Sequence, residues 1–359
     1  MMKGLFCSIL TFLSLLFITN SKSAGDKCYG LVLQGGGDKG AYQAGALSQI
    51  IQDSDPDEVK YDVVSGVSIG SINGALLAGY PKGEELNATD FMIKTWHELT
   101  RKDIYKNWNW GGVARGLLYE DALYDSSPFR EYIKSKLSPP KRHLFVSATD
   151  ATTGAEKTWD ESIPYEDLLL AIDASSSYPG FFSPVKLNGT VYYDGGVSFS
   201  INIHDAVLKC RDKGFKDADI VIDVLLCSGA TFVDKDVSKY KTIPMTLRFY
   251  EIERFYETME LIERGMQDYY EVDFRYVVAP TSKLEPSIVP MEFRHEDIIK
   301  MIEKGKEDAK QAMQFGHRMS ADLFVEYGNK KKFEGYEKDY ADFIDEKLLQ
   351  KEQIKKVIE

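Results

Sequence analysis

Strand-like and helix-like segments alternate along most of this chain, and this alternation restricts the fold more than any other feature of the sequence. Short apolar runs typical of strands occur at 29–34, 61–66, 143–150, 190–195, 219–228 and 274–280. Helix-like runs occur at 40–52, 69–80, 89–100, 126–137, 164–176, 203–213 and 244–271. Strands that alternate with helices predict an α/β fold with a mostly parallel sheet covered on both faces. Unbroken apolar runs such as 29–34 suit strands buried on both sides.

Three further segments bear on the domain organisation. The chain has 359 residues, enough for one large α/β domain or two small ones. Residues 101–125 are rich in Trp, Asn, Gly and Tyr, which predicts a loop or lid over the sheet. A charged amphipathic helix is expected within 296–326. Residues 329–359 carry many charges of both signs and are expected to form a solvated, partly frayed terminal helix, the charged C-terminal tail.

The N-terminus has the pattern of a secretory signal peptide at residues 1–23. Lys3 precedes an uncharged, mostly apolar run at 5–19, which is shorter than the roughly 20 residues that a membrane span needs. Ser21 and Ser23 follow in the small-x-small pattern that signal peptidase reads, so cleavage is expected near residue 23 or 24. The alternative is an uncleaved anchor helix. A cleaved signal predicts a mature chain that is secreted or lies in an endomembrane lumen.

Cysteines, sequons and net charge add to this picture. The mature chain keeps Cys28, Cys210 and Cys227, an odd number that allows one disulfide or three free thiols. Sequons at Asn87 and Asn188 are glycan acceptors in a secretory protein if they are exposed. The formal net charge is −12, and no cluster of Lys and Arg stands clear of acidic residues. A nucleic-acid partner is therefore not expected.

A glycine-rich loop follows the strand at 29–34. Gly35, Gly37 and Gly40 fit G-x-G-x-x-G, the spacing of a dinucleotide-binding loop. Such a site also needs an acidic residue at the end of the second strand, but 61–66 is followed by VSIGS. The acidic residues nearby lie before that strand or at its start, and so at its wrong end (Asp53, Asp55, Asp57, Glu58 and Asp62). The remaining interpretation is a loop whose N–H groups hold the oxyanion of an ester under hydrolysis.

The second strand ends in GVSIG, residues 66–70, which matches G-x-S-x-G. This motif makes a sharp turn from a strand to a helix and exposes the serine hydroxyl at its tip, here Ser68. Gly66 and Gly70 are needed because side chains would collide in so tight a turn. The N–H groups of Gly36 and Gly37 are expected at the same edge of the sheet. A nucleophile and preorganised donors are thus expected together, as an acyl intermediate requires.

The base that would activate Ser68 is not obvious from the histidines, because none of the five lies in a recognisable motif. His143 opens a strand, which puts it at the far edge of the sheet, and His204 opens a helix. Asp194, in VYYDGGVS, ends a short strand at the edge where Ser68 is expected, although Asp-Gly-Gly is also a common plain turn. Asp150 is a second candidate because it too ends a strand.

These blocks together resemble the patatin-like lipid acyl hydrolase family. The resemblance covers roughly residues 29–205 and rests on GGGDKG (35–40), GVSIG (66–70) and DGG (194–196) in that order, supported by ASSSYPGFFSPV (174–185). It implies a three-layer α/β/α fold with a Ser–Asp dyad. Residues 206–328 would then continue the α/β domain with further strands and helices.

Carried over by motif, the resemblance implies Ser68 as the nucleophile, Asp194 as the base, and an oxyanion hole lined by Gly35, Gly36 and Gly37. The residues that would support this site are Lys39, Gly40, Gly66, Gly70, Gly195 and Gly196. One departure is visible, since the family usually has Arg where this chain has Lys39. Lysine keeps the charge but loses the planar fork of arginine, which changes how the side chain can orient the loop.

The expected function is a serine acyl hydrolase that cleaves fatty-acyl esters of phospholipids or related lipids at a membrane or micelle surface. No metal or cofactor is expected, because acyl transfer through a serine requires none. The run DSDPD (53–57) mimics the start of a calcium loop, but it lacks the glycine and the glutamate of such a loop at positions 58 and 64 and is expected to be a solvated turn. One alternative is a catalytically impaired lipid-binding or storage protein. Another is a Ser–Asp–His esterase that uses His204, His295 or His317.

Aromatic residues suggest where a lipid would lie. Residues 178–182 precede Asp194 and are expected either to line an acyl pocket or to pack as ordinary core (Tyr178, Pro179, Phe181 and Phe182). A second group is expected to form a lid or a membrane-touching edge (Trp96, Tyr105, Trp108 and Trp110). A Ser–Asp dyad predicts activity well below pH 6, since the pKa of a free Asp is near ~3.9. A histidine base predicts its loss near pH ~6.5.

Overall fold

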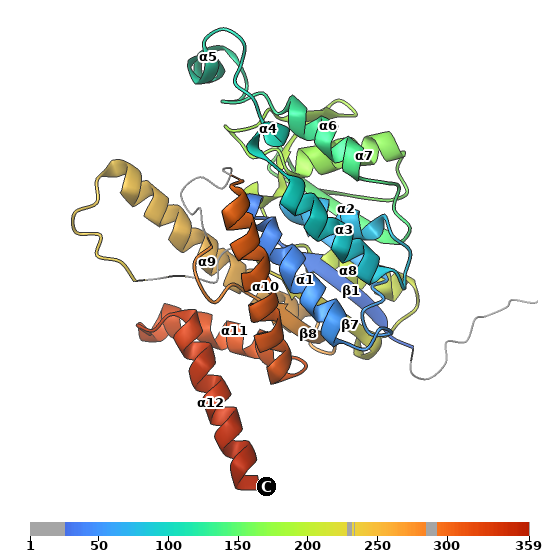
Figure 1. Cartoon of the computed structure of the whole chain (residues 1–359), viewed down its shortest axis with the longest axis vertical. Coiled ribbons are helices and arrows are strands. Elements are labelled where there is room, and N and C mark those ends of the chain that lie inside the picture. Colours follow the sequence, from blue (N-terminus) through green and yellow to red (C-terminus); the bar gives the residue numbers. More distant parts are fainter. Residues whose placement is uncertain (1–25, 228–231, 233, 285–292, 359) are drawn as a thin grey trace, which may run out of the picture.

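A single mixed sheet organises the molecule, with helices against both of its faces (Figure 1). The computed structural model describes residues 26–227, 232, 234–284 and 293–358. The expected signal peptide at 1–23 lies outside the described residues. The eight strands run in the order β5-β6-β3-β2-β1-β7-β8, and β4 pairs with β3. Strands from both sides of residue 205 therefore belong to the same sheet.

The centre of the sheet is parallel and one end is antiparallel. β1 (Cys28–Leu33), β2 (Val63–Val67), β3 (His143–Asp150), β7 (Ile220–Leu225) and β8 (Asp273–Val278) pair in parallel. The pairings of β4 (Glu156–Asp160), β5 (Val185–Leu187) and β6 (Thr190–Asp194) are antiparallel. β2 and β7 are buried along their whole length, because helices cover both of their faces.

Two apolar layers enclose the sheet. One contains α1 (Gly40–Asp53), α2 (Ile69–Ala78), α3 (Glu85–Glu98), α6 (Ser127–Lys136), α7 (Tyr165–Ser175) and α10 (His295–Phe315). The other contains α8 (Ile203–Asp212), α9 (Thr242–Asp268), α11 (Met319–Asn329) and the start of α12 (Tyr340–Ile358). The expected α/β/α fold is thereby confirmed. None of the described helices is both long and apolar enough to cross a membrane.

Several segments differ from the expectations drawn from the sequence. Residues 101–125 hold two short helices, α4 (Arg101–Ile104) and α5 (Gly112–Tyr119), instead of a bare loop. The single helix expected within 296–326 is divided, because Gly316 ends α10 with a φ of 87° before α11 begins. The charged tail is not solvated throughout, since its apolar residues pack against α11 and the core beneath it (Tyr340, Phe343 and Ile344).

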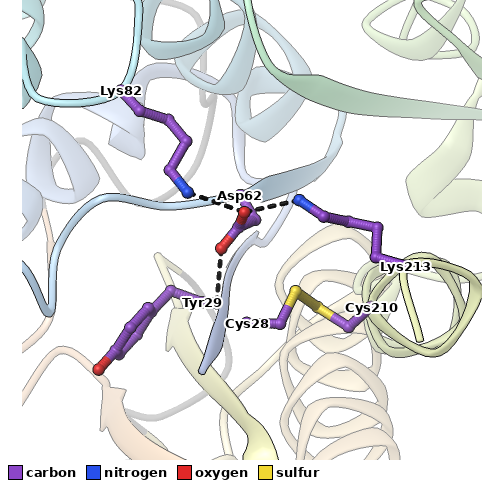
Figure 2. Close-up of a disulfide and its surroundings, with 6 residues drawn as sticks. All are labelled: Cys28, Tyr29, Asp62, Lys82, Cys210 and Lys213. Atoms are coloured by element: carbon purple, nitrogen blue, oxygen red, sulfur yellow. Dashed lines mark hydrogen bonds and ion pairs between the residues drawn. A yellow bond between two sulfur atoms is a disulfide. The ribbon is translucent and has the colours of Figure 1, made fainter. Parts of the chain in front are cut away.

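A disulfide links the first strand to α8, in the helix layer that also contains α9 and α11. Cys28 at the start of β1 is bonded to Cys210 on α8, and Cys227 is a buried free thiol (Figure 2). Close by, the Asp62 carboxylate accepts hydrogen bonds from Lys82 (2.8 Å), from Lys213 (2.6 Å) and from the backbone N–H of Tyr29 (3.2 Å). Of the two patterns that the cysteine count allowed, the structure has the single disulfide.

Two glycines let α1 and α10 approach each other closely. A Cβ on Gly45 of α1 would lie 2.0 Å from the Ile302 carbonyl oxygen, and one on Gly305 of α10 would lie 2.1 Å from the Tyr42 carbonyl oxygen. The two backbones are thus in direct contact. Because α1 begins where the glycine-rich loop ends, the contact with α10 fixes the position of the helix that carries the loop.

Candidate active site

Ser68 lies at the tip of the sharp turn between β2 and α2. Its φ of 56° is unusual for a residue other than glycine and marks local strain. Gly66 and Gly70 are the reason that the turn closes, since a Cβ on Gly66 would lie 2.3 Å from the Gly70 carbonyl oxygen. The Ser68 N–H donates to Ser175 Oγ at 2.9 Å, and the Ser71 hydroxyl donates to the Ser68 carbonyl at 2.6 Å. These bonds hold the strained backbone in one position.

Strand register brings Asp194 beside Ser68. β2 ends with Val67 opposite Ser147 of β3, and β4 occupies the other edge of β3 at that point. The next residue of β3, Ala148, faces Asp194 of β6. β6 therefore continues along the edge that β2 leaves. The residue after Val67 is Ser68, so the two side chains meet where one strand replaces the other.

The two side chains form a short hydrogen bond in a buried setting. Ser68 Oγ donates to Asp194 Oδ2 at 2.6 Å, while the N–H of Gly196 donates to Asp194 Oδ1 at 2.8 Å. Burial raises the pKa of Asp194 to about 6, against the opposing effects of these two hydrogen bonds and of the Arg254 charge. The carboxylate is thus oriented by Gly196 and is a stronger base than a solvated aspartate.

The glycine-rich loop lies at the same edge of the sheet. The N–H of Gly35 donates to the Ser200 carbonyl at 3.1 Å, so this residue lines the site without offering a free donor. Within the described chain, the N–H groups of Gly36 and Gly37 donate to no protein acceptor. Two of the three glycines expected at the oxyanion hole therefore keep the donors that such a hole needs. Lys39 also borders this space.

A cavity of about 210 Å³ opens above Ser68. Its polar side consists of the glycine loop, Ser68, Asp194, Lys39 and Arg254. Its apolar side is lined by Ile69, Ile104, Phe129, Tyr178, Phe182 and Phe293. A smaller apolar cavity of about 30 Å³ shares four of those walls and extends toward Leu76, Leu99 and Leu137. Such a site fits an apolar chain whose polar end lies at Ser68.

The alternative bases lie elsewhere. None of the histidines, all of which the structure describes, lines this cavity. His204 contacts the Tyr269 hydroxyl, His317 lies 2.9 Å from Asp273, and His295 packs against the ring of His97. Asp150 closes the turn after β3 by accepting the Thr152 N–H at 2.8 Å. The Asp150 carboxylate therefore stabilises a turn and is not in contact with Ser68.

The aromatic residues divide between wall, core and surface. Tyr178 and Phe182 line the cavity, whereas Phe181 packs on Tyr124 outside it. Of the residues expected to form a lid, Trp96 is instead buried, and its Nε1 donates to Asn73 at 3.0 Å. Trp108 donates to the Ala122 carbonyl, and the Tyr105 ring packs at a tilt against the Tyr124 ring. Trp110 is 91% exposed.

Two residues of the site were not found from the sequence. Arg254, on α9, borders the cavity and donates to the Gly196 carbonyl at 3.2 Å. Ser175 links the Ser68 N–H to the carbonyl of Ser147, to which it donates at 2.6 Å. Ser175 lies within the ASSSYPGFFSPV block, which was a usable signal. No sequence signal pointed to Arg254, because it lies on a long helix that is distant in the sequence from every motif.

The expected glycan acceptors, Asn87 and Asn188, are both exposed. Asn87 lies on α3, and Asn188 lies in the turn between β5 and β6. Their positions leave both side chains accessible from solvent.

Comparison with known proteins relates just under half of the chain to a known family. Residues 31–207 match the sequence model described as "Patatin-like phospholipase". An uncharacterized protein, R571 of Acanthamoeba polyphaga mimivirus, is 28% identical over 197 residues, which make up 52% of this chain and 65% of that protein. The crystal structure of VipD from Legionella pneumophila aligns with a TM-score of 0.42 and 12% identity, covering 93% of this chain and 77% of that one. Residues 31–207 of the chain form a patatin-like phospholipase domain.

Proposed function

We propose that this chain is a serine acyl hydrolase that cleaves fatty-acyl esters of phospholipids or related lipids through a covalent acyl-enzyme. The observation that carries the proposal is the 2.6 Å hydrogen bond from Ser68 Oγ to the buried Asp194 carboxylate. A serine hydroxyl needs an adjacent base to become a nucleophile. Asp194 is the titratable group in contact with it.

The reaction follows from the positions of the two side chains. Asp194 accepts the proton of Ser68 as Oγ bonds to the ester carbonyl carbon, and the carbonyl oxygen becomes an oxyanion. The N–H groups of Gly36 and Gly37 stabilise that oxyanion. When the intermediate collapses, the ester C–O bond breaks and Asp194 returns the proton to the departing alcohol or lysolipid.

The second half of the cycle releases the fatty acid. Asp194 takes a proton from water, whose oxygen bonds to the acyl carbon. The bond to Ser68 Oγ then breaks, and the proton returns to the serine. The apolar lining favours a fatty-acyl chain, and Lys39 and Arg254 favour an anionic headgroup beside it. A phospholipid combines both features.

The test is hydrolysis of a phospholipid and of a short p-nitrophenyl ester by the mature chain, beside Ser68→Ala and Asp194→Asn. We expect turnover without added calcium by the wild type and a loss of about 10³-fold or more in each folded variant. A fluorophosphonate should label the wild type and not Ser68→Ala. A folded wild type that neither turns over nor is labelled would contradict the proposal and favour a lipid-binding protein of the same fold.

We also propose that the mature chain is secreted or lies in an endomembrane lumen. The Cys28–Cys210 disulfide supports an oxidising compartment, and exposed Asn87 and Asn188 suit glycan addition. Expression in the native host should give a species shortened at residue 23 or 24 whose mobility shifts after glycan removal. A full-length, unglycosylated and intracellular species would contradict this.

A further inference from the structure

Two exposed apolar protrusions flank the candidate active site. The first protrusion consists of α5 and the two residues before it, Trp110 and Gly111. Its exposed apolar side chains are Trp110, Val113, Leu117, Leu118 and Tyr119. The second is the first part of α9, with exposed Ile243, Met245, Leu247, Phe249 and Tyr250. Figure 1 shows α5 projecting at the top of the molecule and the start of α9 projecting at the upper left, both away from α12.

The start of α9 is apolar on faces that nothing in the described chain covers. Ile243, Leu247 and Tyr250 recur at helical spacing on one side, and Met245 and Phe249 lie on another. From Lys241 to Tyr250 only Arg248 is buried. A helix this apolar is normally packed against a partner. Its exposure indicates a surface that is covered when the protein works.

Both protrusions are anchored at the rim of the cavity. The chain after α5 is held to the loop that contains the cavity residue Tyr178, since the N–H of Leu123 donates to the Gly180 carbonyl at 2.8 Å. On α9, Arg254 lines the cavity one turn after Tyr250. Each protrusion is therefore linked to a residue of the cavity wall.

The charges of the second protrusion identify the kind of surface that it fits. Residues 237–250, which lie between Asp236 and Glu251, contain Lys239, Lys241 and Arg248 but no acidic residue, in a chain whose formal net charge is −12. Arg248 pairs with Glu251 at 3.0 Å. Lys239 and Lys241 are exposed, and neither pairs with a carboxylate of the described residues. Aromatic and aliphatic side chains beside unpaired lysines are typical of helices that lie in the interface of an anionic bilayer.

We propose that α5 and the start of α9 form a docking surface for an anionic phospholipid bilayer, which they enter on either side of the cavity. This inference rests on the proposed function for its substrate and goes beyond it by naming the surface that delivers the substrate. Docking brings the mouth of the cavity against the headgroups. A single lipid then enters with its acyl chain toward the apolar wall and its ester at Ser68.

The first experiment measures vesicle binding without catalysis. Ser68→Ala is mixed with phosphatidylcholine vesicles, with and without phosphatidylglycerol, and the bound fraction is followed by flotation. We expect tighter binding to the anionic vesicles. Ile243→Gln with Leu247→Gln, and separately Leu117→Gln with Leu118→Gln, should each weaken binding by about tenfold. Leu349→Gln with Ile354→Gln, which changes two exposed residues of α12, is the matched control and should bind as the parent does.

Charge is tested separately. Lys239→Gln with Lys241→Gln should remove most of the preference for phosphatidylglycerol, and added salt should do the same to the parent. Unchanged binding in both apolar double variants, or equal weakening by the α12 control, would overturn the docking surface. An unchanged lipid preference in the lysine variant would overturn its anionic selectivity.

The same changes in the active chain separate this proposal from the catalytic one. Variants of α9 and α5 should hydrolyse the soluble p-nitrophenyl ester as the wild type does, while hydrolysis of vesicle phospholipid falls by about tenfold. If the protein hydrolyses no ester but Ser68→Ala binds vesicles through α9 and α5, the catalytic proposal fails and the docking surface stands. If the soluble ester is hydrolysed but no vesicle is bound, the docking surface fails alone.

Discussion

Burial of Asp194 is the residue-level feature with the widest consequences. The sequence alone predicts that a Ser–Asp dyad works well below pH 6, because it treats the aspartate as solvated. In the structure burial raises the pKa of Asp194 to about 6. An aspartate base in this setting should therefore lose its proton-accepting form in the pH range usually attributed to histidine. An acid limb near pH 6 does not by itself indicate a triad.

The first prediction concerns this acid limb. For the soluble ester, kcat/KM should rise with pH through a midpoint near the Asp194 pKa of about 6, because only the ionised carboxylate accepts the Ser68 proton. Arg254 lowers that pKa by its charge, so Arg254→Gln should move the midpoint to higher pH. Arg211→Gln, on the surface of α8, is the control. A midpoint that stays in place in Arg254→Gln and shifts in a histidine variant would contradict the assignment.

The same burial predicts a gain in stability when the charge is removed. Between the unfolded pKa near ~3.9 and the folded value of about 6, the folded state binds more protons, so stability falls as pH rises through this range. The unfolding free energy of Asp194→Asn should exceed that of the wild type by up to about 3 kcal/mol at pH 8 and by little at pH 4. Denaturant unfolding at the two pH values measures this. If the substitution changed the unfolding free energy equally at the two pH values, the buried Asp194 charge would not be destabilising.

At the scale of elements, the site depends on backbone contacts that the sequence does not reveal. The alternation of strand-like and helix-like runs predicted the parallel strands, and the G-x-S-x-G motif predicted the turn at Ser68. β4 and β5 were missed, because one is largely exposed and charged and the other has only three residues. Arg254 reaches the site through the packing of a helix that follows the matched domain. Its position depends on tertiary contacts that no local pattern encodes.

The contact between α1 and α10 gives a prediction at this scale. In Gly305→Ala the added Cβ would lie 2.1 Å from the Tyr42 carbonyl oxygen, which forces the helices apart. We expect a loss of about 1–3 kcal/mol in stability and a lower kcat on the soluble ester, since α1 begins at the glycine loop. Thermal unfolding measures the stability, and steady-state kinetics on the soluble ester measures kcat. Glu303→Ala, at an exposed position of α10, is the control, and an equal response of the two variants would contradict the packing argument.

At the scale of the whole molecule, the family domain and the rest of the chain share one sheet. β1 pairs with β7 along six residue positions, from Cys28–Ile220 to Leu33–Leu225, and β7 lies outside the matched residues 31–207. The Cys28–Cys210 bond joins the residues that precede the matched segment to those that follow it. The matched segment alone would expose one edge of β1 and lose Arg254 and α10.

The last prediction follows from this arrangement. A fragment of residues 24–207 should fail to fold, because it leaves the buried strand β1 unpaired on one side and uncovers much of both apolar layers. The chain 24–359, prepared in parallel, should unfold cooperatively. Circular dichroism during heating distinguishes them. A monomeric fragment with a sharp transition would contradict the prediction.

The replacement of β2 by β6 along the edge of β3 has a consequence for the newly made protein. Ser68 and Asp194 are separated by 126 positions and meet only when β6 takes its place on β3. A chain still being synthesised, with residue 194 not yet added, holds Ser68 without Asp194. Under the proposed function, hydrolytic activity would therefore arise only late in biogenesis, after β6 has paired with β3.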